Sequence, residues 1–255
     1  MAIDTHAHLF DKAFDFDRDE VIQRIILNKI ENVVIVVFSH ETKSQAYDLS
    51  KKYSFMYPTA GLHPSDANDY NEEDIRVLGA FVTNHRVYAI GECGLDYYWH
   101  KDNKEKQQWL FENQIKLAIK YNLPIIIIHS RDAISDTFEM LNKYANQVKF
   151  VMHCYSGSWE MAERFMKIGG YISLGGPVTF KNAKEPKIVA KNIDINRLMI
   201  ETDCPYLAPM PMRGKRNETS YVLNVLTEIA NLKEMNKDDL EKVLNRNSIE
   251  FFGLK

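Results

Sequence analysis

The most constraining feature of this 255-residue chain is an alternation of short apolar runs with longer segments of helical period. Runs such as 33–38 and 124–128 are apolar at every position, which is typical of parallel strands buried on both faces. The expected strands are 2–3, 32–38, 55–61, 86–91, 123–129, 148–153, 171–174 and 197–201. The expected helices are 18–29, 42–53, 72–83, 104–121, 132–144, 160–168, 182–191, 221–232 and 237–252.

This order of elements predicts an α/β fold, a single (β/α)8 TIM barrel over residues 1–255. The chain contains no linker rich in Gly, Ser or Pro that would divide it into two domains. A doubly wound open sheet has the same alternation and is the competing architecture, because periodicity does not separate the two.

The composition is that of an ordinary globular protein, with 45% hydrophobic and 26% charged residues. No window approaches the run of about 20 apolar residues that crosses a bilayer. Residues 1–10 carry Asp4 and two histidines where a signal peptide needs a basic start and an apolar centre. Three cysteines give no disulfide framework. We therefore expect a cytoplasmic protein, and the net charge of −3 argues against broad electrostatic binding of nucleic acid while permitting a local basic patch.

Histidines and carboxylates gather at the carboxyl ends of the expected strands. In an α/β barrel these ends meet on one face, where active sites are built. Imidazole and carboxylate groups are ligands for divalent ions. The predicted metal ligands are His6, His8, Glu92, His129, His153 and Asp203.

Four histidines and two carboxylates exceed the needs of one tetrahedral ion, which favours two divalent ions (Mg, Mn or Zn) with Glu92 as the bridge. One ion is expected on His6, His8, Glu92 and Asp203, and the other on Glu92, His129 and His153. The two carboxylates neutralise only part of the charge of two divalent ions, and about two positive charges remain. This net charge favours an anionic ligand such as phosphate.

Four residues are predicted to be catalytic: Asp203, Glu92, Glu201 and His63. Asp203 orients a water molecule whose pKa the ions lower to about 7, and takes its proton. Glu201 assists from the same side of its strand, and His63 lines the site near the leaving group. The competing interpretation is structural, since a lone histidine after a strand usually just completes a hydrogen bond. Against it, five of the eight histidines follow expected strands.

Each cysteine directly follows a predicted ligand, at Cys93, Cys154 and Cys204. Neighbouring side chains on an extended segment point to opposite sides, so the thiols are expected in the core between strands and helices. A nucleophilic Cys154 paired with histidine is the alternative, and it leaves the other ligands unexplained.

Basic residues near the expected site are candidate contacts for a phosphate. Arg131 binds phosphate bidentately in one interpretation and forms a salt bridge at the start of the next helix in the other. The loop after the last strand carries Arg213, Lys215 and Arg216, which are expected to overhang the active-site face. The aromatic residues 97–99 either stack on bases or pack against the fold.

Seven separated motifs occur in order: DTHAHL, GLHP, GECGLDYY, HSR, HCYSG, ETDCPYLAP and RGKRNE. Together with the closing NRNSIEFFGL they resemble the TatD-type metal-dependent deoxyribonucleases, a branch of the amidohydrolase-like barrel superfamily. The resemblance implies a TIM barrel, a divalent-metal site formed by the same six ligands, and hydrolysis of DNA phosphodiester bonds, often from the 3′ end. The chain departs from the family at Thr219, commonly proline, and at Trp99 and His100, where relatives often carry a basic residue, which leaves substrate preference open.

The expected function is therefore hydrolysis of nucleic-acid phosphodiester bonds by a TatD-like 3′–5′ exodeoxyribonuclease that acts through a metal-bound hydroxide. Its expected partner is DNA, single-stranded or at a 3′ end, with no membrane and no obligate protein partner, and the protein is expected to be a monomer. The first alternative is hydrolysis of a small amide, lactone or ester by the same two-metal site. The second is a non-catalytic barrel that keeps metal for stability.

Overall fold

A computed structural model describes residues 1–99 and 101–255, and for residues 127–131 it describes the backbone alone. Within these limits the strands are β1 (Ile3–Ala7), β2 (Asn32–Ile35), β3 (Met56–Pro58), β4 (Ile90–Asp96), β5 (Ile125–Arg131), β6 (Phe150–Met152), β7 (Tyr171–Leu174) and β8 (Leu198–Ile200). The helices are α1 (Arg18–Leu27), α2 (His40–Lys52), α3 (Glu72–Asn84), α4 (Lys104–Tyr121), α5 (Ile134–Lys143), α6 (Trp159–Lys167), α7 (Lys184–Asn192), α8 (Val222–Lys233) and α9 (Lys237–Phe252). Short 3₁₀ turns are η1 (Lys12–Phe14), η2 (Pro64–Asp69), η3 (Gly176–Thr179), η4 (Ile195–Arg197) and η5 (Thr219–Tyr221).

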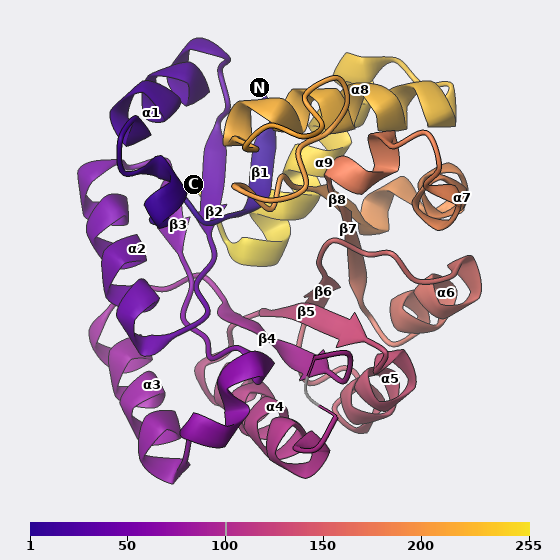
Figure 1. Cartoon of the computed structure of the whole chain (residues 1–255). Helices are drawn as coiled ribbons and strands as arrows, with labels where there is room; N and C mark the ends of the chain where they lie inside the picture. The colour runs from indigo at the N-terminus through magenta and orange to yellow at the C-terminus, as the bar shows by residue number, and fades with distance from the viewer. Residues whose placement is uncertain (100) are drawn as a thin grey trace.

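The strands are parallel and follow one another in chain order around a ring, with α1 to α8 outside it (Figure 1). They form two hydrogen-bonded groups, β1 to β3 and β4 to β8. Single parallel bridges join the groups, Ala60 to Ile90 at one seam and Ala7 to Cys204 at the other. The predicted (β/α)8 architecture is confirmed, because a doubly wound sheet has two edge strands that never meet.

Two apolar clusters show how the ring is filled. The larger cluster contains Val33 and Ile35 of β2 together with residues of the surrounding helices, such as Phe111 of α4. The smaller one takes the alternate strand positions, including Val34, and among the described residues it has no member from α1 to α8. Its remaining members come from the end of the chain, at Phe251, Phe252 and Leu254. The period of two thus sends one side chain into the barrel and the next toward the helices, while the end of α9 covers the bottom.

Several strands continue further than the apolar pattern predicted. The first extends to Ala7, the fourth runs over Ile90–Asp96 in place of 86–91, and the fifth extends to Arg131. His6, Glu92 and His129 therefore lie inside strands and not after them. Backbone hydrogen bonds between strands do not require apolar side chains. The strands therefore continue past the end of the apolar run, with polar side chains directed into the open end of the barrel.

None of the helices in the described part of the chain is both long enough and apolar enough to span a bilayer.

Two glycines from separate motifs touch at the seam between β3 and β4. A Cβ on Gly61 would lie 2.4 Å from the carbonyl carbon of Gly91 and 2.7 Å from the backbone nitrogen of Glu92. Gly91 itself has φ +133°, and a Cβ there would lie 2.6 Å from the carbonyl oxygen of Ile126. The backbone that carries Glu92 is therefore placed by close contacts that only glycine permits.

Replacing Gly61 by alanine is expected to lower the melting temperature by about 3–10 °C, because the added methyl must push backbone, at a cost of about 1–3 kcal/mol. Gly79→Ala on α3 is the matched control, since its Cβ would meet only side-chain atoms of Leu117 and Tyr121 at 3.4 and 3.5 Å. That control is expected to be neutral or stabilising, as alanine favours a helix interior. Thermal unfolding followed by circular dichroism compares the two, and equal shifts would contradict the close contact.

Candidate metal centre

The strand β1 brings two histidines to one point. His6 and His8 are two residues apart, so both rings project to the same side, and their Nε2 atoms lie 3.3 Å apart. Both residues are almost fully buried. The Nε2 of His6 and that of His8 are each 3.5 Å from Oε2 of Glu92, and they are 3.7 and 3.3 Å from Oδ1 of Asp203.

These separations fit a divalent ion. Four ligand atoms at about 2.0–2.1 Å from a tetrahedral centre lie about 3.4 Å from one another. The five distances among His6, His8, Glu92 and Asp203 are 3.3 to 3.7 Å. His6, His8 and Asp203 also form one of the candidate cation-binding groups among the described residues. Two imidazoles and two carboxylates are a suitable donor set for Zn or Mn.

Glu92 presents a different oxygen to a second group of histidines. Its Oε1 lies 3.6 Å from Nε2 of His153 and 3.9 Å from Nε2 of His63. The His153 ring is stacked on that of His6, with ring centroids 3.9 Å apart. One buried carboxylate thus lies between His6 and His8 on one side and His153 on the other, and its role as a bridging ligand stays a prediction.

The hydrogen bonds at Nδ1 separate the histidines into two kinds. Nδ1 of His8 lies 2.7 Å from the carbonyl oxygen of Val36, and Nδ1 of His153 lies 3.0 Å from Oε1 of Glu201. Both partners only accept, so each Nδ1 carries the proton and the neutral ring turns a bare Nε2 toward the cleft. Nδ1 of His63 instead accepts from the backbone N–H of Ser65 at 3.1 Å, so its neutral ring has the proton on Nε2. In their neutral forms, His8 and His153 therefore have an unprotonated Nε2, whereas His63 has an Nε2–H.

The buried carboxylates strongly affect the protonation of these rings. Burial opposes a charge on His153, but Glu201, and then Glu92 and Asp203, outweigh it and raise its pKa to about 9. Burial also opposes a charge on His8, and Asp203 and Glu92 again raise its pKa above the ordinary value. Burial raises the pKa of Glu92 to about 7, and the neighbouring His8 and His153 partly offset this effect. Without an ion, the site therefore holds protons at neutral pH where a cation would bind.

The seam between β8 and β1 places Asp203 and depends on Asp4, a residue that the sequence analysis gave no role. Asp203 has φ +58°, and its N–H donates to the carbonyl oxygen of His6 at 2.9 Å. Asp4 is fully buried and accepts from the N–H and Oγ1 of Thr202, at 2.9 and 2.6 Å, and from the N–H of His6 at 3.2 Å. Burial raises the pKa of Asp4 to about 7 despite these hydrogen bonds. The available signal was the position of Asp4 two residues before His6 in one extended segment, which predicts that the two side chains project to the same side.

Three of the predicted residues lie partly or wholly outside the described part of the chain. The side chains of His129 and Arg131 are among those not described, and so is all of His100. The metal-ligand role of His129 and the phosphate contact of Arg131 stay predictions. Glu201 is described, is buried, and also accepts from the N–H of Cys154 at 2.6 Å.

The basic loop after β8 divides into exposed and engaged residues. Arg213 and Lys215 are exposed, with the Arg213 guanidinium 4.3 Å from the centre of the Phe180 ring. Arg216 forms a two-pronged ion pair with Asp17, both nitrogen–oxygen distances being 2.6 Å. Arg216 therefore fastens the loop to the start of α1, which leaves Arg213 and Lys215 as the basic groups turned to solvent.

The thiols of Cys93 and Cys204 lie in the core, as predicted, and burial raises the pKa of both. None of the three cysteines is in a disulfide, and Cys154, which was also expected in the core, is partly exposed with φ +42°. Among aromatic residues 97–99, Tyr97 is buried and hydrogen-bonded to Asp136, so it packs against the fold, while Tyr98 and Trp99 are exposed.

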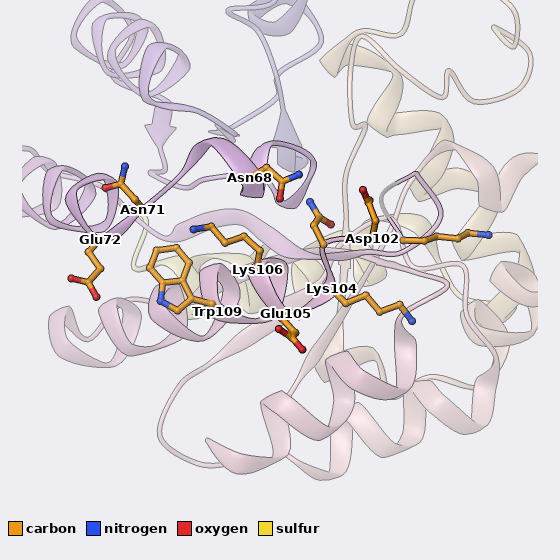
Figure 2. Close-up of a pocket in the computed structure, with 10 residues that line it drawn as sticks. Asn68, Asn71, Glu72, Asp102, Lys104, Glu105, Lys106 and Trp109 are labelled. Carbon is orange, nitrogen blue, oxygen red and sulfur yellow. The ribbon is translucent and has the colours of Figure 1, made fainter.

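Two hollows at the helix-start side of the molecule differ in chemistry. The larger, about 980 Å³, lies between the η2–α3 corner and the start of α4 (Figure 2). Its lysines Lys101, Lys104 and Lys106 are balanced by Glu72, Asp102 and Glu105, and neither candidate cation group lies there. The smaller, about 340 Å³, has His8, Glu92, His153 and Asp203 in its lining together with His63. Candidate metal ligands therefore line the smaller cleft.

Binding of a divalent ion is expected to release about one proton at pH 7.5, because His153, whose pKa is raised to about 9, is protonated in the metal-free site. As pH rises through about 9, His153 loses its proton, so proton competition weakens, metal affinity rises and proton release falls. Calorimetric titration with Zn²⁺ in buffers of different ionisation enthalpy measures the release. His153→Asn is expected to release about one proton fewer. Release that stays at zero in the parent protein would contradict the site as described.

Comparison with known proteins agrees with this chemistry. A family model described as TatD related DNase matches residues 3–253. The chain is 47% identical to an uncharacterized metal-dependent hydrolase of Bacillus subtilis, YabD, with 100% of both chains aligned. It is 33% identical to the uncharacterized metal-dependent hydrolase YcfH of Escherichia coli, over 99% of this chain and 96% of that one.

Among solved structures, that of YjjV, a TatD homologue from Escherichia coli, has a TM-score of 0.94 and 27% identity. The match covers 100% of this chain and 98% of that one. A TatD family hydrolase from Entamoeba histolytica has a TM-score of 0.86 and 25% identity, over 98% and 97% of the two chains. This chain therefore belongs to the family of TatD related DNases and is a metal-dependent hydrolase.

Proposed function

We propose that the protein hydrolyses phosphodiester bonds of nucleic acid, as a 3′–5′ exonuclease acting on single-stranded DNA. The observation that carries this proposal is the position of the Glu92 carboxylate. One of its oxygens faces His6 and His8, and the other faces His153. Two divalent cations whose carboxylate ligands are Glu92 and Asp203 leave an excess of positive charge within the ligand set, which suits a phosphate better than a neutral amide or ester.

We assign His6, His8, Glu92 and Asp203 to a first ion and Glu92, His153 and the predicted ligand His129 to a second. Mg, Mn or Zn bound there supplies charge neutralisation for phosphoryl oxygens and acidifies a water molecule. The Nε2 atoms of His8 and His153 face the cleft because Val36 and Glu201 hold their Nδ1 protons. Glu201 is thus a positioning residue, which fixes the ring of His153 and touches neither the ions nor the substrate in this proposal.

Asp203 is the proposed general base. Its side chain is 13% exposed, against 0–7% for His6, His8, Glu92 and His153, so it is the most open of these five to a water molecule in the cleft. A carboxylate oxygen of Asp203 orients this water and takes its proton as it attacks phosphorus.

His63 is the proposed general acid. Its Nε2–H projects into the cleft beside Glu92, while the Ser65 N–H holds Nδ1 and so keeps the proton on the inner nitrogen. From there the ring donates to the oxygen that leaves phosphorus. Arg213 and Lys215, exposed on the loop after β8, are the proposed contacts for phosphates further along the strand.

Three cysteines without a disulfide suit a reducing compartment, and we propose that the protein is cytoplasmic and a monomer that needs no protein partner.

The purified protein is expected to shorten a 5′-labelled single-stranded DNA oligonucleotide stepwise from its 3′ end in the presence of Mg²⁺ or Mn²⁺. A chelator is expected to abolish the ladder, and Glu92→Gln to lower the rate at least about 100-fold, because the bridging charge is lost. Denaturing electrophoresis gives the readout, with the exposed variant Leu27→Ala as control for preparation. If metal binds and no oligonucleotide is cleaved, while a panel of small amides, lactones and esters yields a substrate, the nuclease proposal is wrong.

Asp203→Asn separates catalysis from metal-dependent stability. The amide keeps an oxygen for the ion but has lost the basic carboxylate, so activity is expected to fall about 100-fold or more while the more open position limits the effect on folding. Metal content by elemental analysis is expected to fall far less than activity. A variant with full metal and unaltered activity would show that another group takes the proton.

A further inference from the structure

The smaller cleft, called the metal cleft below, is lined by both polar and aromatic residues. The candidate ligands His8, Glu92, His153 and Asp203 share its lining with His63, Ser65 and Asp66. Phe38 and Tyr206 are also in the lining, with ring centroids 5.6 and 6.1 Å from that of His8. A ligand that fits such a cleft has an anionic part for the candidate ligands and a flat apolar part for the aromatic rings.

Tyr206 is exposed in a way that packing does not explain. Its side chain is 51% exposed, although its ring lies 6.1 Å from the ring of His8, at 65° to it. Leu207 and Met210, from the same loop, are exposed by 44% and 46% and extend the apolar surface beside it. An exposed aromatic ring next to buried candidate ligands marks a contact surface more than a core position.

The backbone of Tyr206 is held firmly although its ring is open. Its N–H donates to the carbonyl oxygen of Asp203 at 2.9 Å, and its own carbonyl oxygen accepts from Nδ2 of Asn217 at 2.6 Å. The phenol reaches Oδ2 of Asp11 at 3.4 Å. A ring fixed in this way loses little conformational freedom when a planar group stacks on it.

Resting on the proposed function, we propose that Tyr206 is a specificity-determining residue that stacks on the base of the terminal nucleotide while the phosphate of that nucleotide lies over the candidate ligands. The cleft volume of about 340 Å³ is at the low end for ligand sites, which suits a single nucleotide residue and not a base pair. The hydroxyl, directed to Asp11, takes no part in the stacking. The ring therefore favours a terminal residue that carries a base over one that does not, and distinguishes little between the different bases.

Binding of a product tests this without relying on cleavage. dAMP and 2-deoxyribose 5-phosphate differ by the base alone, and both are titrated into the Mn²⁺-loaded protein. Wild type is expected to bind dAMP about tenfold more tightly than the sugar phosphate, since stacking on an aromatic side chain contributes about a factor of ten. Tyr206→Leu is expected to lose this preference while binding the sugar phosphate as before, and Tyr206→Phe to keep it. Equal weakening of both ligands by Tyr206→Leu, or no change in either, would overturn the proposal.

Cleavage adds a second measurement and separates the two proposals. Single-stranded oligonucleotides with a normal or an abasic 3′-terminal residue are compared by kcat/KM. Tyr206→Leu is expected to lower the value about tenfold on the normal end and less than about twofold on the abasic end. Ring-dependent binding of dAMP without any cleavage would support the stacking role and refute the nuclease. Cleavage that is indifferent to the ring on both ends would refute the stacking role and leave the nuclease standing.

Discussion

The hydrogen-bonded seam between the first and last strands is the constraint on which the site depends. The carboxylate of Asp4 ties the N–H and hydroxyl of Thr202 to the N–H of His6, and the backbone of Asp203 is bonded to the carbonyl oxygen of His6. Residues about 200 positions apart thereby take fixed places beside each other. Because a metal site tolerates little error in ligand position, the precision of the site comes from this seam as much as from the ligands.

In the absence of metal, the buried charged groups of this site lower the stability of the folded state. Glu92, His8 and His153 are buried together, and burial of a charged group is unfavourable unless it is paired. Their mutual attraction reduces that cost by holding protons on the imidazole rings, which is visible in the raised pKa values. A divalent ion replaces those protons with a stronger charge at the same point. Ion binding is therefore expected to stabilise the folded state. Gly61 and Gly91 contribute to the same site, because their close backbone contacts fix the position of Glu92.

The fold was largely predictable from sequence because buried parallel strands are apolar at every position and helices are not. The residue types of the site were predictable as well, because a set of histidines and carboxylates gathered after such strands, unlike a lone histidine, is typical of metal sites. Contacts between residues far apart in the sequence were not predictable. Arg216 was expected near substrate, but its ion pair with Asp17 joins residues 199 positions apart and follows from no local pattern. Tyr206 was overlooked because exposure beside a cleft is a property of the assembled barrel.

The loop between β8 and α8 is fastened at its far end. Asn217 bonds to the carbonyl oxygens of Thr202 and Tyr206, Arg216 is held by Asp17, and Glu218 by Arg24 at 2.8 Å. The segment between Tyr206 and Arg216 is thus a loop whose two ends are both bonded to the barrel. Such a segment can be exchanged or lengthened without shifting the strands that hold metal. New substrate ranges can therefore arise, in evolution or in the laboratory, by replacing about ten residues while the hydrolytic machinery is inherited unchanged.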